Sequence, residues 1–266
     1  CNYVTIDSDD DGMQTEQLHD LISTNIKFIY ALPNFQNPSG TTLSLERRKQ
    51  LIELANSQGV PIIEDDPYGQ LRYEGEHLPP VVVLDDEIRS KEFPVYPGNV
   101  IYTSTFSKIL APGLRLAWVV APVDVIKKLV QAKQGSDLNT STFNQFVAYE
   151  LAKSPWMREH IQTIRKVYRE RRDTMLEALE NNMPEGTDWT KPKGGLFLWV
   201  KLPEGCDTTK LFPKAIEEKV AYVPGESFHP NGGGKNTMRL NFSACNPETI
   251  KIGIQRLGKM IKDQLK

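Results

Sequence analysis

Short apolar runs alternate with an amphipathic segment along the first half of the chain. Residues 2–7, 27–33, 60–66 and 100–106 are apolar stretches of strand length bounded by turn-forming residues, a pattern that predicts β-strands. Residues 44–59 carry apolar side chains at helical spacing and end in glycine, which predicts an amphipathic helix. The order strand, helix, strand predicts an α/β fold with a largely parallel sheet covered by helices.

Polar residues follow three of these predicted strands. Asn37 comes after the second strand, Asp65 ends the third, and Lys108 lies just past the fourth. Open parallel sheets bind ligands at the carboxyl ends of their strands. We therefore expect these residues to lie at the ligand-binding edge of the sheet.

The second half of the chain has a different texture. Residues 156–182 form one long helical pattern, which we interpret as a helix that links two domains. The remaining pattern predicts strands at 194–203, 220–225 and 237–244 and helices at 208–219 and 247–265. We therefore expect a large domain at 1–155 and, at 156–266, the linking helix with a small α/β domain. The polar run 85–99 is expected to be an exposed loop.

Composition excludes several classes of function. The chain has 266 residues, is 39% hydrophobic, and has a formal net charge of -2; a polyanionic partner such as nucleic acid is not expected. No apolar run is long enough for a membrane helix. The three cysteines, which are far apart in the sequence, suggest neither a disulfide framework nor a metal site. These features favour a soluble protein of the cytoplasm.

The surroundings of Lys108 suggest a specific chemistry. A lysine taken by itself is usually a solvated surface amine. Here, the hydroxyl residues Thr105 and Ser107 precede it, and a Pro-Gly turn leads to Arg115. Such a segment can hold a phosphate beside an amine. An amine near a phosphate suggests a Schiff base with pyridoxal phosphate.

These residues resemble the cofactor-lysine signature of class I pyridoxal-phosphate aminotransferases of fold type I. Five further segments match the family's motifs in the family's order: 37–40, 64–68, 191–203, 223–230 and 238–243. Their wording is most similar to the branch that contains 2-aminoadipate, kynurenine and aromatic amino-acid aminotransferases. The resemblance implies a large domain with a mostly parallel sheet and a small C-terminal α/β domain.

The resemblance also assigns roles around the cofactor ring. It implies that Asp65 pairs with the ring nitrogen and keeps it protonated. The family spacing Asp-x-x-Tyr selects Asp65, together with Tyr68, over Asp66. Tyr68 and Asn37 are expected to donate hydrogen bonds to the phenolic oxygen, and the resemblance implies a cis peptide before Pro38.

Catalytic and anchoring roles follow in the same way. By resemblance, Lys108 holds the cofactor covalently and then moves the substrate's proton, so Lys108, Asp65 and Tyr68 are the expected catalytic residues. The expected phosphate anchors are Thr105, Ser107 and Arg115. Arg239 is expected to bind the substrate α-carboxylate in a bidentate manner, with Asn37 also at the substrate.

The implied activity is transfer of an amino group between an L-amino acid and a 2-oxo acid, with 2-oxoglutarate as the expected acceptor. Two alternatives stay open: a lyase or synthase on the same fold, and the effector domain of an aminotransferase-like transcription regulator. Family members carry a substantial segment before the position of Cys1, so this chain resembles their C-terminal portion. Relatives pair as homodimers, and we expect the same of the complete protein.

Overall fold

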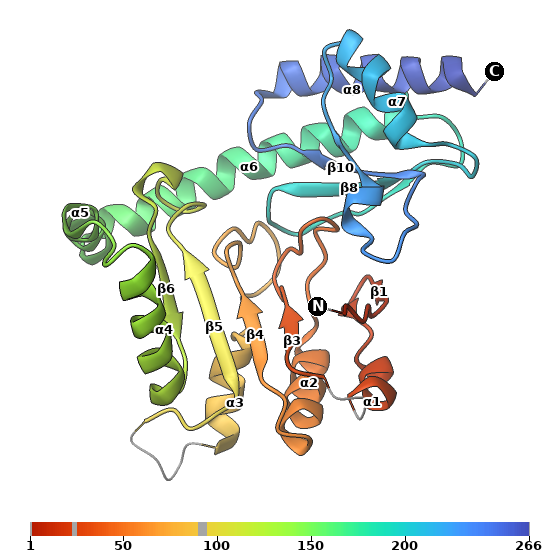
Figure 1. The fold of residues 1–266 in the computed structure, drawn as a ribbon. Helices are drawn as coiled ribbons and strands as arrows, with labels where there is room; N and C mark the ends of the chain where they lie inside the picture. The colour runs from red at the N-terminus through yellow and green to blue at the C-terminus, as the bar shows by residue number, and fades with distance from the viewer. Residues whose placement is uncertain (1, 23–25, 90–94, 266) are drawn as a thin grey trace. The chain divides into compact units, whose positions relative to one another are not determined.

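Figure 1 shows the computed structural model of the chain, which describes residues 2–22, 26–89 and 95–265. The chain divides into two compact units. Unit 1 comprises Cys1–Tyr3, Phe35–Gly40 and Ile164–Lys266, and unit 2 comprises Val4–Asn34 and Thr41–Thr163. In the second half of the chain, the boundary between the units falls inside the long helix α6 (Pro155–Asn182).

Unit 2 is built on a four-stranded sheet in the order β3-β4-β5-β6. Strands β3 (Ile29–Ala31), β4 (Ile62–Asp65) and β5 (Val100–Thr105) are parallel, as predicted, and β6 (Ala117–Val120) runs antiparallel to β5. Because β3, β4 and β5 point the same way, the chain leaves all three at one edge of the sheet (Figure 1). The loops that follow these strands therefore share that edge.

Two helices cover one face of this sheet. Helix α2 (Leu45–Ser57) begins after Ser44, whose hydroxyl accepts a hydrogen bond from the Arg47 amide, and ends before Gly59, confirming the predicted helix. Helix α3 (Val81–Arg89) follows β4. Apolar residues of both helices pack with those of β3, β4 and β5 in one buried cluster. This cluster is the core of unit 2.

Helices α4 (Val123–Ser136) and α5 (Thr142–Lys153) come after β6 and contribute little to that core. Among the described residues, α4 has no buried side chain and α5 has one, Ala148. The large apolar side chains of α5 that stay exposed are Phe143, Phe146 and Tyr149.

Unit 1 contains an antiparallel sheet in the order β7-β8-β10-β9. Its strands are β7 (Asp188–Trp189), β8 (Phe197–Lys201), β9 (Val223–Pro224) and β10 (Thr237–Asn241). Its other elements are α7 (Thr208–Glu217), the short 3-10 helix η4 (Gly225–Phe228) and α8 (Pro247–Gln264). The core of the unit is apolar, with Leu198, Val200, Leu240, Ile254 and Leu257 buried. The predicted strands and helices of this region are confirmed, although β9 is shorter than expected.

The prediction of a strand at 2–7 is wrong. These residues adopt no regular structure, and Tyr3 and Val4 are exposed; among the described residues no neighbouring strand pairs with them. A small hairpin follows instead, formed by β1 (Ser8–Asp9) and β2 (Gly12–Met13) and succeeded by the short helices η1 (Thr15–Gln17) and α1 (Leu18–Leu21).

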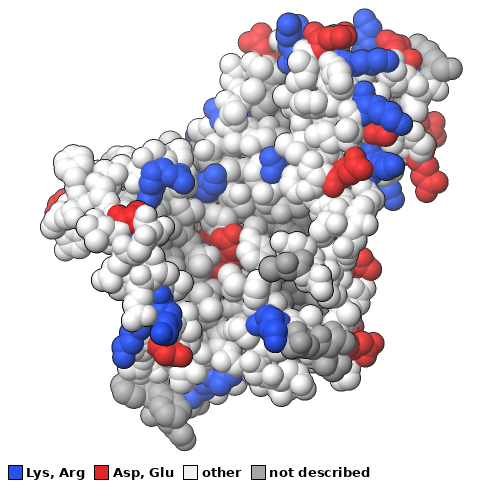
Figure 2. Space-filling view, in the orientation of Figure 1, with Lys and Arg blue, Asp and Glu red and all other residues white. Residues whose placement is uncertain are grey.

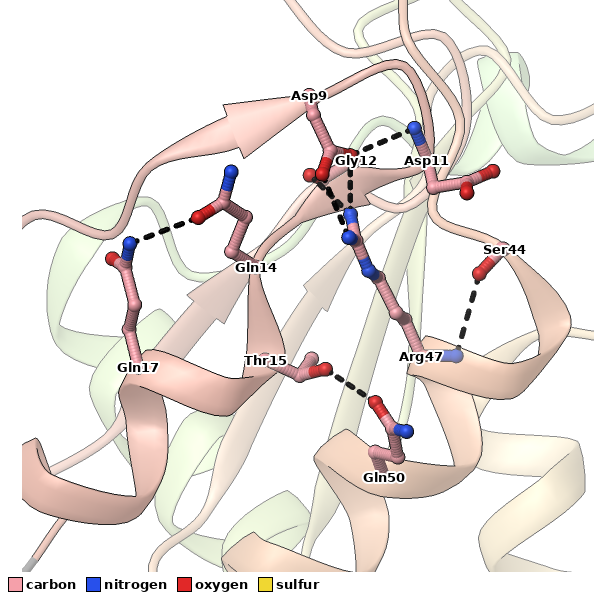
Figure 3. A network of polar contacts seen from close by, with 9 residues as sticks. All are labelled: Asp9, Asp11, Gly12, Gln14, Thr15, Gln17, Ser44, Arg47 and Gln50. Carbon is pink, nitrogen blue, oxygen red and sulfur yellow. Dashed lines mark hydrogen bonds and ion pairs between the residues drawn. The ribbon is translucent and has the colours of Figure 1, made fainter.

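Polar contacts attach this hairpin to helix α2 (Figure 3). The Arg47 guanidinium donates to both carboxylate oxygens of Asp9 and, at 2.9 Å, to the Gly12 carbonyl. The Thr15 hydroxyl donates to Gln50 at 2.6 Å. Bidentate Arg–carboxylate pairs are directional, so Arg47 fixes where the hairpin lies on α2.

The polar run 85–99 is not simply an exposed loop, because its first residues belong to α3 and Asp85 is fully buried. The Asp85 carboxylate accepts hydrogen bonds from Asn56 at 2.9 Å, from Arg89 at 3.0 Å and from the Tyr96 hydroxyl at 2.6 Å. These donors offset the cost of burying a carboxylate. Residues 90–94 of the run lie outside the described residues.

No helix among the described residues is long and apolar enough to cross a membrane. On the face of the molecule shown in Figure 2, basic and acidic side chains are interspersed rather than gathered into areas of one sign. That distribution agrees with the small net charge of the sequence.

Candidate active site

Strand β4 places Asp65 at the edge of the unit 2 sheet. Side chains alternate between the two faces of a strand, and in β4 Ile62 and Glu64 are buried while Ile63 and Asp65 are only partly covered. Two donors approach the Asp65 carboxylate: the Tyr30 hydroxyl at 2.6 Å from Oδ2 and the Thr103 hydroxyl at 3.4 Å from Oδ1. Asp65 is thus a strand-end carboxylate held on the partly open face of the sheet.

The neighbouring Asp66 points into the interior instead. Its buried carboxylate accepts hydrogen bonds from the Asn34 side chain at 2.9 Å, from the Gly69 amide at 3.0 Å and from the Tyr102 hydroxyl at 3.3 Å. The bond to Gly69 closes the turn that carries Tyr68, whose side chain is buried. Asp66 therefore shapes the loop after β4, whereas Asp65 faces away from these contacts.

A buried arginine, which the sequence analysis missed, contacts the segments that surround the loop after β4. Arg48 of α2 is fully buried and donates to the Asn34 side chain at 2.7 Å, to the Pro33 carbonyl at 3.1 Å and to the Pro79 carbonyl at 2.9 Å. Burial lowers the pKa of its guanidinium to about 10. The signal in the sequence was its position on the apolar side of the predicted helix, where arginine is unusual.

Glu64 is a second buried charged residue under the site. Its two carboxylate oxygens accept hydrogen bonds from the amides of Val81 and Val82, at 2.8 and 2.9 Å, at the start of α3. Carboxylates are stabilised at helix N-termini. Burial outweighs these bonds and raises the pKa of Glu64 to about 7.

The turn after β5 carries the predicted phosphate anchors and Lys108. The Thr105 hydroxyl lies 2.9 Å from the Ser107 hydroxyl, accepts a hydrogen bond from the Ser107 amide at 3.0 Å and lies 2.9 Å from the Leu116 carbonyl. These contacts bring the two predicted hydroxyls together. Because β4 and β5 are adjacent and parallel, Lys108 follows β5 at the same edge of the sheet at which Asp65 ends β4.

Arg115 follows a short 3-10 helix, η3 (Pro112–Leu114), in a left-handed conformation with φ of 53°. Its guanidinium is exposed and donates to the Pro112 carbonyl at 3.0 Å. The backbone amide of Phe106 donates to the Leu116 carbonyl at 3.1 Å. The chain around Arg115 is therefore fastened next to the turn of Thr105 and Ser107.

Unit 1 holds the two remaining predicted residues, Asn37 and Arg239. The Arg239 guanidinium donates to Asn37 Oδ1 at 2.6 Å and lies over the rings of Phe197 and Phe228, at 4.3 and 5.2 Å from their centroids. This contact uses the oxygen of Asn37, while the predicted role of Asn37 needs its amide nitrogen as a donor. The expected cis peptide before Pro38 is confirmed.

The structure thus groups the predicted residues by unit. Unit 2 contains Asp65, Tyr68, Thr105, Ser107, Lys108 and Arg115, and unit 1 contains Asn37 and Arg239. The roles assigned to them stay a prediction. The contact of Tyr30 with Asp65 was not foreseen, although an aromatic residue on the strand next to a functional carboxylate is a visible signal.

A largely parallel sheet with polar residues at its strand ends defines an α/β protein, a class in which ligands bind at that edge. More specifically, the chain belongs to the aminotransferase class I and II family, whose model matches residues 1–257. The family predicted from the motifs is confirmed.

Relatives in the predicted branch are similar to this chain. An aromatic-amino-acid aminotransferase 1 of Thermococcus litoralis is 45% identical over 270 residues, covering 99% of this chain and 62% of the relative. The chain therefore spans less than two thirds of the length of that relative.

Two solved structures show the same fold. A Pyrococcus horikoshii kynurenine aminotransferase, solved in complex with PMP, is 46% identical with a TM-score of 0.92, covering 99% of this chain and 64% of that one. An α-aminoadipate aminotransferase from Thermus thermophilus, complexed with N-(5'-phosphopyridoxyl)-L-leucine, is 40% identical with a TM-score of 0.93, covering 99% and 66%. These matches confirm the predicted fold type I architecture.

Proposed function

We propose that the protein is a pyridoxal-phosphate-dependent aminotransferase that moves an amino group between an L-amino acid and a 2-oxo acid. The observation that carries this proposal is the placement of Asp65 and Lys108 at one edge of one sheet, in a chain of the aminotransferase class I and II family. The names of its relatives support an aromatic amino acid, kynurenine or 2-aminoadipate as the amino donor. We propose 2-oxoglutarate as the acceptor.

The residues of unit 2 fit pyridoxal phosphate in their donor chemistry. Asp65 keeps its carboxylate on the partly open face while Asp66 is consumed by internal hydrogen bonds, so Asp65 is the acid suited to a ring nitrogen. The paired hydroxyls of Thr105 and Ser107, with the exposed cation of Arg115, suit a phosphate. Lys108 supplies the amine that an aldehyde requires.

When bound, pyridoxal phosphate would supply an aldehyde carbon that holds the amino group between the two substrates and a ring that withdraws electrons from it. The Asp65 carboxylate holds a proton on the ring nitrogen by charge pairing. Tyr68 and the amide nitrogen of Asn37 donate to the phenolic oxygen. The Lys108 amine would take the proton from the substrate α-carbon and deliver it to the cofactor's C4′ carbon within the same half-reaction, and the second half-reaction would run this transfer in reverse.

Arg239 binds the substrate α-carboxylate in this proposal. A guanidinium presents two parallel N–H donors to a carboxylate, which an ammonium cannot do. The guanidinium carbon of Arg239 lies 4.3 Å from the centroid of the Phe197 ring and 5.2 Å from that of Phe228, and contacts with aromatic rings leave its N–H groups as the hydrogen-bonding part. We also propose that the complete protein is a homodimer, as the family resemblance implies, and that it is cytoplasmic, as its cysteine usage suggests.

The proposal is tested with the complete protein that contains this chain. Pyridoxal phosphate is added, the visible absorbance of the complex is recorded, and a candidate amino acid and then 2-oxoglutarate are supplied. We expect a visible band that the amino acid bleaches and 2-oxoglutarate restores, with one glutamate formed per donor consumed.

Other outcomes contradict the proposal in distinct ways. The absence of a visible band in the wild-type protein contradicts the proposal that it binds pyridoxal phosphate. A band accompanied by release of ammonia or carbon dioxide, without glutamate, favours the lyase or synthase alternative. A band without turnover of any amino acid favours the effector domain of a regulator.

A further inference from the structure

Tyr30 makes the shortest of the hydrogen bonds described for Asp65. It lies in the middle of β3, where it pairs in register with Ile63 of β4. Because alternate residues of a strand share a face, Tyr30, Ile63 and Asp65 lie on the same face of the sheet. The Tyr30 hydroxyl reaches diagonally to the next residue on that face and donates to Asp65 Oδ2 at 2.6 Å.

The ring of Tyr30 is not part of the core of unit 2. The side chain is 54% exposed, so its ring contributes little to the core, which lies on the opposite face with Ile29 and Ile62. The feature that distinguishes it from an apolar residue of the same shape is the hydroxyl. That hydroxyl is directed at the carboxylate that the proposed function places on the cofactor's ring nitrogen.

The direction of the hydrogen bond is fixed over the working pH range. Partial burial and the adjacent Asp65 carboxylate both raise the pKa of Tyr30 above its ordinary value. The hydroxyl therefore keeps its proton and remains the donor. A donor held at one oxygen restricts rotation of the carboxylate.

We propose that Tyr30 is a positioning residue that orients the Asp65 carboxylate, so that this carboxylate pairs with the ring nitrogen of the bound cofactor. This inference rests on the proposed function. Tyr30 acts through Asp65 and touches neither substrate nor reacting atoms in this role.

The test is Tyr30→Phe in the complete protein, which removes the hydroxyl and keeps the ring. Pyridoxamine phosphate is the binding probe, because it needs no covalent bond to Lys108. We expect its dissociation constant to rise about fivefold, the typical effect of losing one hydrogen bond. With pyridoxal phosphate bound, we expect the midpoint of the pH-dependent visible band to move to higher pH, since an unprotonated ring nitrogen withdraws less charge.

Tyr96→Phe is the matched control. Tyr96 also donates to a carboxylate at 2.6 Å, that of Asp85, but it lies away from the carboxyl ends of the strands. If the loss of any tyrosine–carboxylate hydrogen bond lowered the affinity for pyridoxamine phosphate, both variants would show the same fall in affinity. We expect Tyr96→Phe to lower the stability of the protein and to leave the pyridoxamine phosphate affinity and the pH midpoint unchanged.

Asp65→Ala shows whether Tyr30 acts through Asp65. In that background, Tyr30→Phe should change pyridoxamine phosphate affinity by less than about twofold, because the acceptor is gone. The same fivefold loss with and without Asp65 would overturn the inference, as would a Tyr30→Phe variant identical to wild type in both measurements. Failure of the wild type to bind pyridoxal phosphate would end both the proposed function and this inference, whereas the previous two results would end the inference alone.

Discussion

Asp65 in unit 2 and Arg239 in unit 1 carry opposite charges and are held by different kinds of contact. Hydroxyl groups approach the oxygens of Asp65, the nearest being that of Tyr30 at 2.6 Å. Aromatic rings lie against the Arg239 guanidinium, and Asn37 accepts from one of its nitrogens. A carboxylate is oriented by directional donors, whereas a planar guanidinium can be supported on its faces while its edge binds a ligand.

The buried residues near Asp65 and near Arg239 also differ in polarity. The buried carboxylates among the described residues, Glu64, Asp66 and Asp85, all lie in unit 2. The core near Arg239 is apolar, with Leu198 and Leu240 in the adjoining strand positions. We therefore expect substitutions in unit 2 to alter cofactor attachment and pH dependence, and substitutions at Arg239 to alter substrate affinity.

Lys108→Ala should have the largest effect, and it acts on the cofactor side alone. Removing the amine removes both covalent attachment and proton transfer, so we expect amino transfer to fall by about 10⁴-fold or more. The visible band of the bound cofactor should disappear, while pyridoxamine phosphate still binds. Absorbance spectra and single-turnover assays of the complete protein measure both.

Lys128→Ala is the control for that experiment. Lys128 is an exposed lysine of α4 that contacts Gln131 at 3.5 Å, and its loss should leave the band and the turnover intact. A Lys108→Ala variant that keeps the visible band would show that another amine holds the cofactor. The assignment of cofactor attachment to Lys108 of unit 2 would then be wrong.

Arg239→Lys should have a smaller effect, confined to the substrate. Lysine keeps the charge but loses the bidentate geometry and the guanidinium's contacts with the two rings, so we expect kcat/KM to fall about 100-fold through a higher KM. The absorbance of the bound cofactor should not change. Arg256→Lys, at an exposed arginine of α8 that contacts the Glu218 carbonyl, should behave as wild type.

One further measurement tests whether Arg239 binds the substrate α-carboxylate. An amine donor without an α-carboxylate makes no contact with the edge of the Arg239 guanidinium, so Arg239→Lys should not slow its reaction. An equal loss with that amine would mean that Arg239 supports the fold or the cofactor rather than the carboxylate.

The elements with regular apolar spacing were predictable from the sequence. Strands β3, β4, β5, β8 and β10 and helices α2, α6, α7 and α8 coincide with predicted segments. One face of each of these elements is buried in its unit. That face is apolar, so the spacing of the apolar residues is visible in the sequence. The strand predicted at 2–7 is not formed: an apolar pattern needs a partner that supplies hydrogen bonds, and among the described residues no strand pairs with this segment.

Features that depend on tertiary contacts were missed, even where the sequence carried a weak signal. Asp85 was assigned to a loop because its neighbours are polar, yet three side-chain donors bring it into the interior. Arg48 looked like one more charge on a helix, and Tyr30 like one more strand aromatic. The predicted positions of Asp65 and Lys108 at one sheet edge followed from parallel strand order, whereas their roles came from the family resemblance.

Glu64→Gln should have the smallest effect. It tests whether the stability of unit 2 depends on pH through this buried carboxyl. Burial raises its pKa to about 7 in the folded protein, well above the ordinary value of a glutamate, so the folded state binds more protons than the unfolded state between these values. Its contribution to stability is present at acidic pH and is lost as the pH rises through 7. We expect unit 2 to lose about 2 kcal/mol of unfolding free energy between pH 5 and pH 8 from this group.

Urea unfolding at a series of pH values, compared between wild type and Glu64→Gln, measures this contribution. The glutamine cannot ionise, so the difference between the two proteins should shrink or reverse as the pH rises, whatever the other groups do. Glu53→Gln, at an exposed position on α2, should run parallel to wild type over the whole range. Parallel curves for Glu64→Gln as well would mean that the amides of Val81 and Val82, with Arg48, compensate fully for burial of the charge. Unit 2 would then be no more sensitive to pH at this position than the apolar core of unit 1.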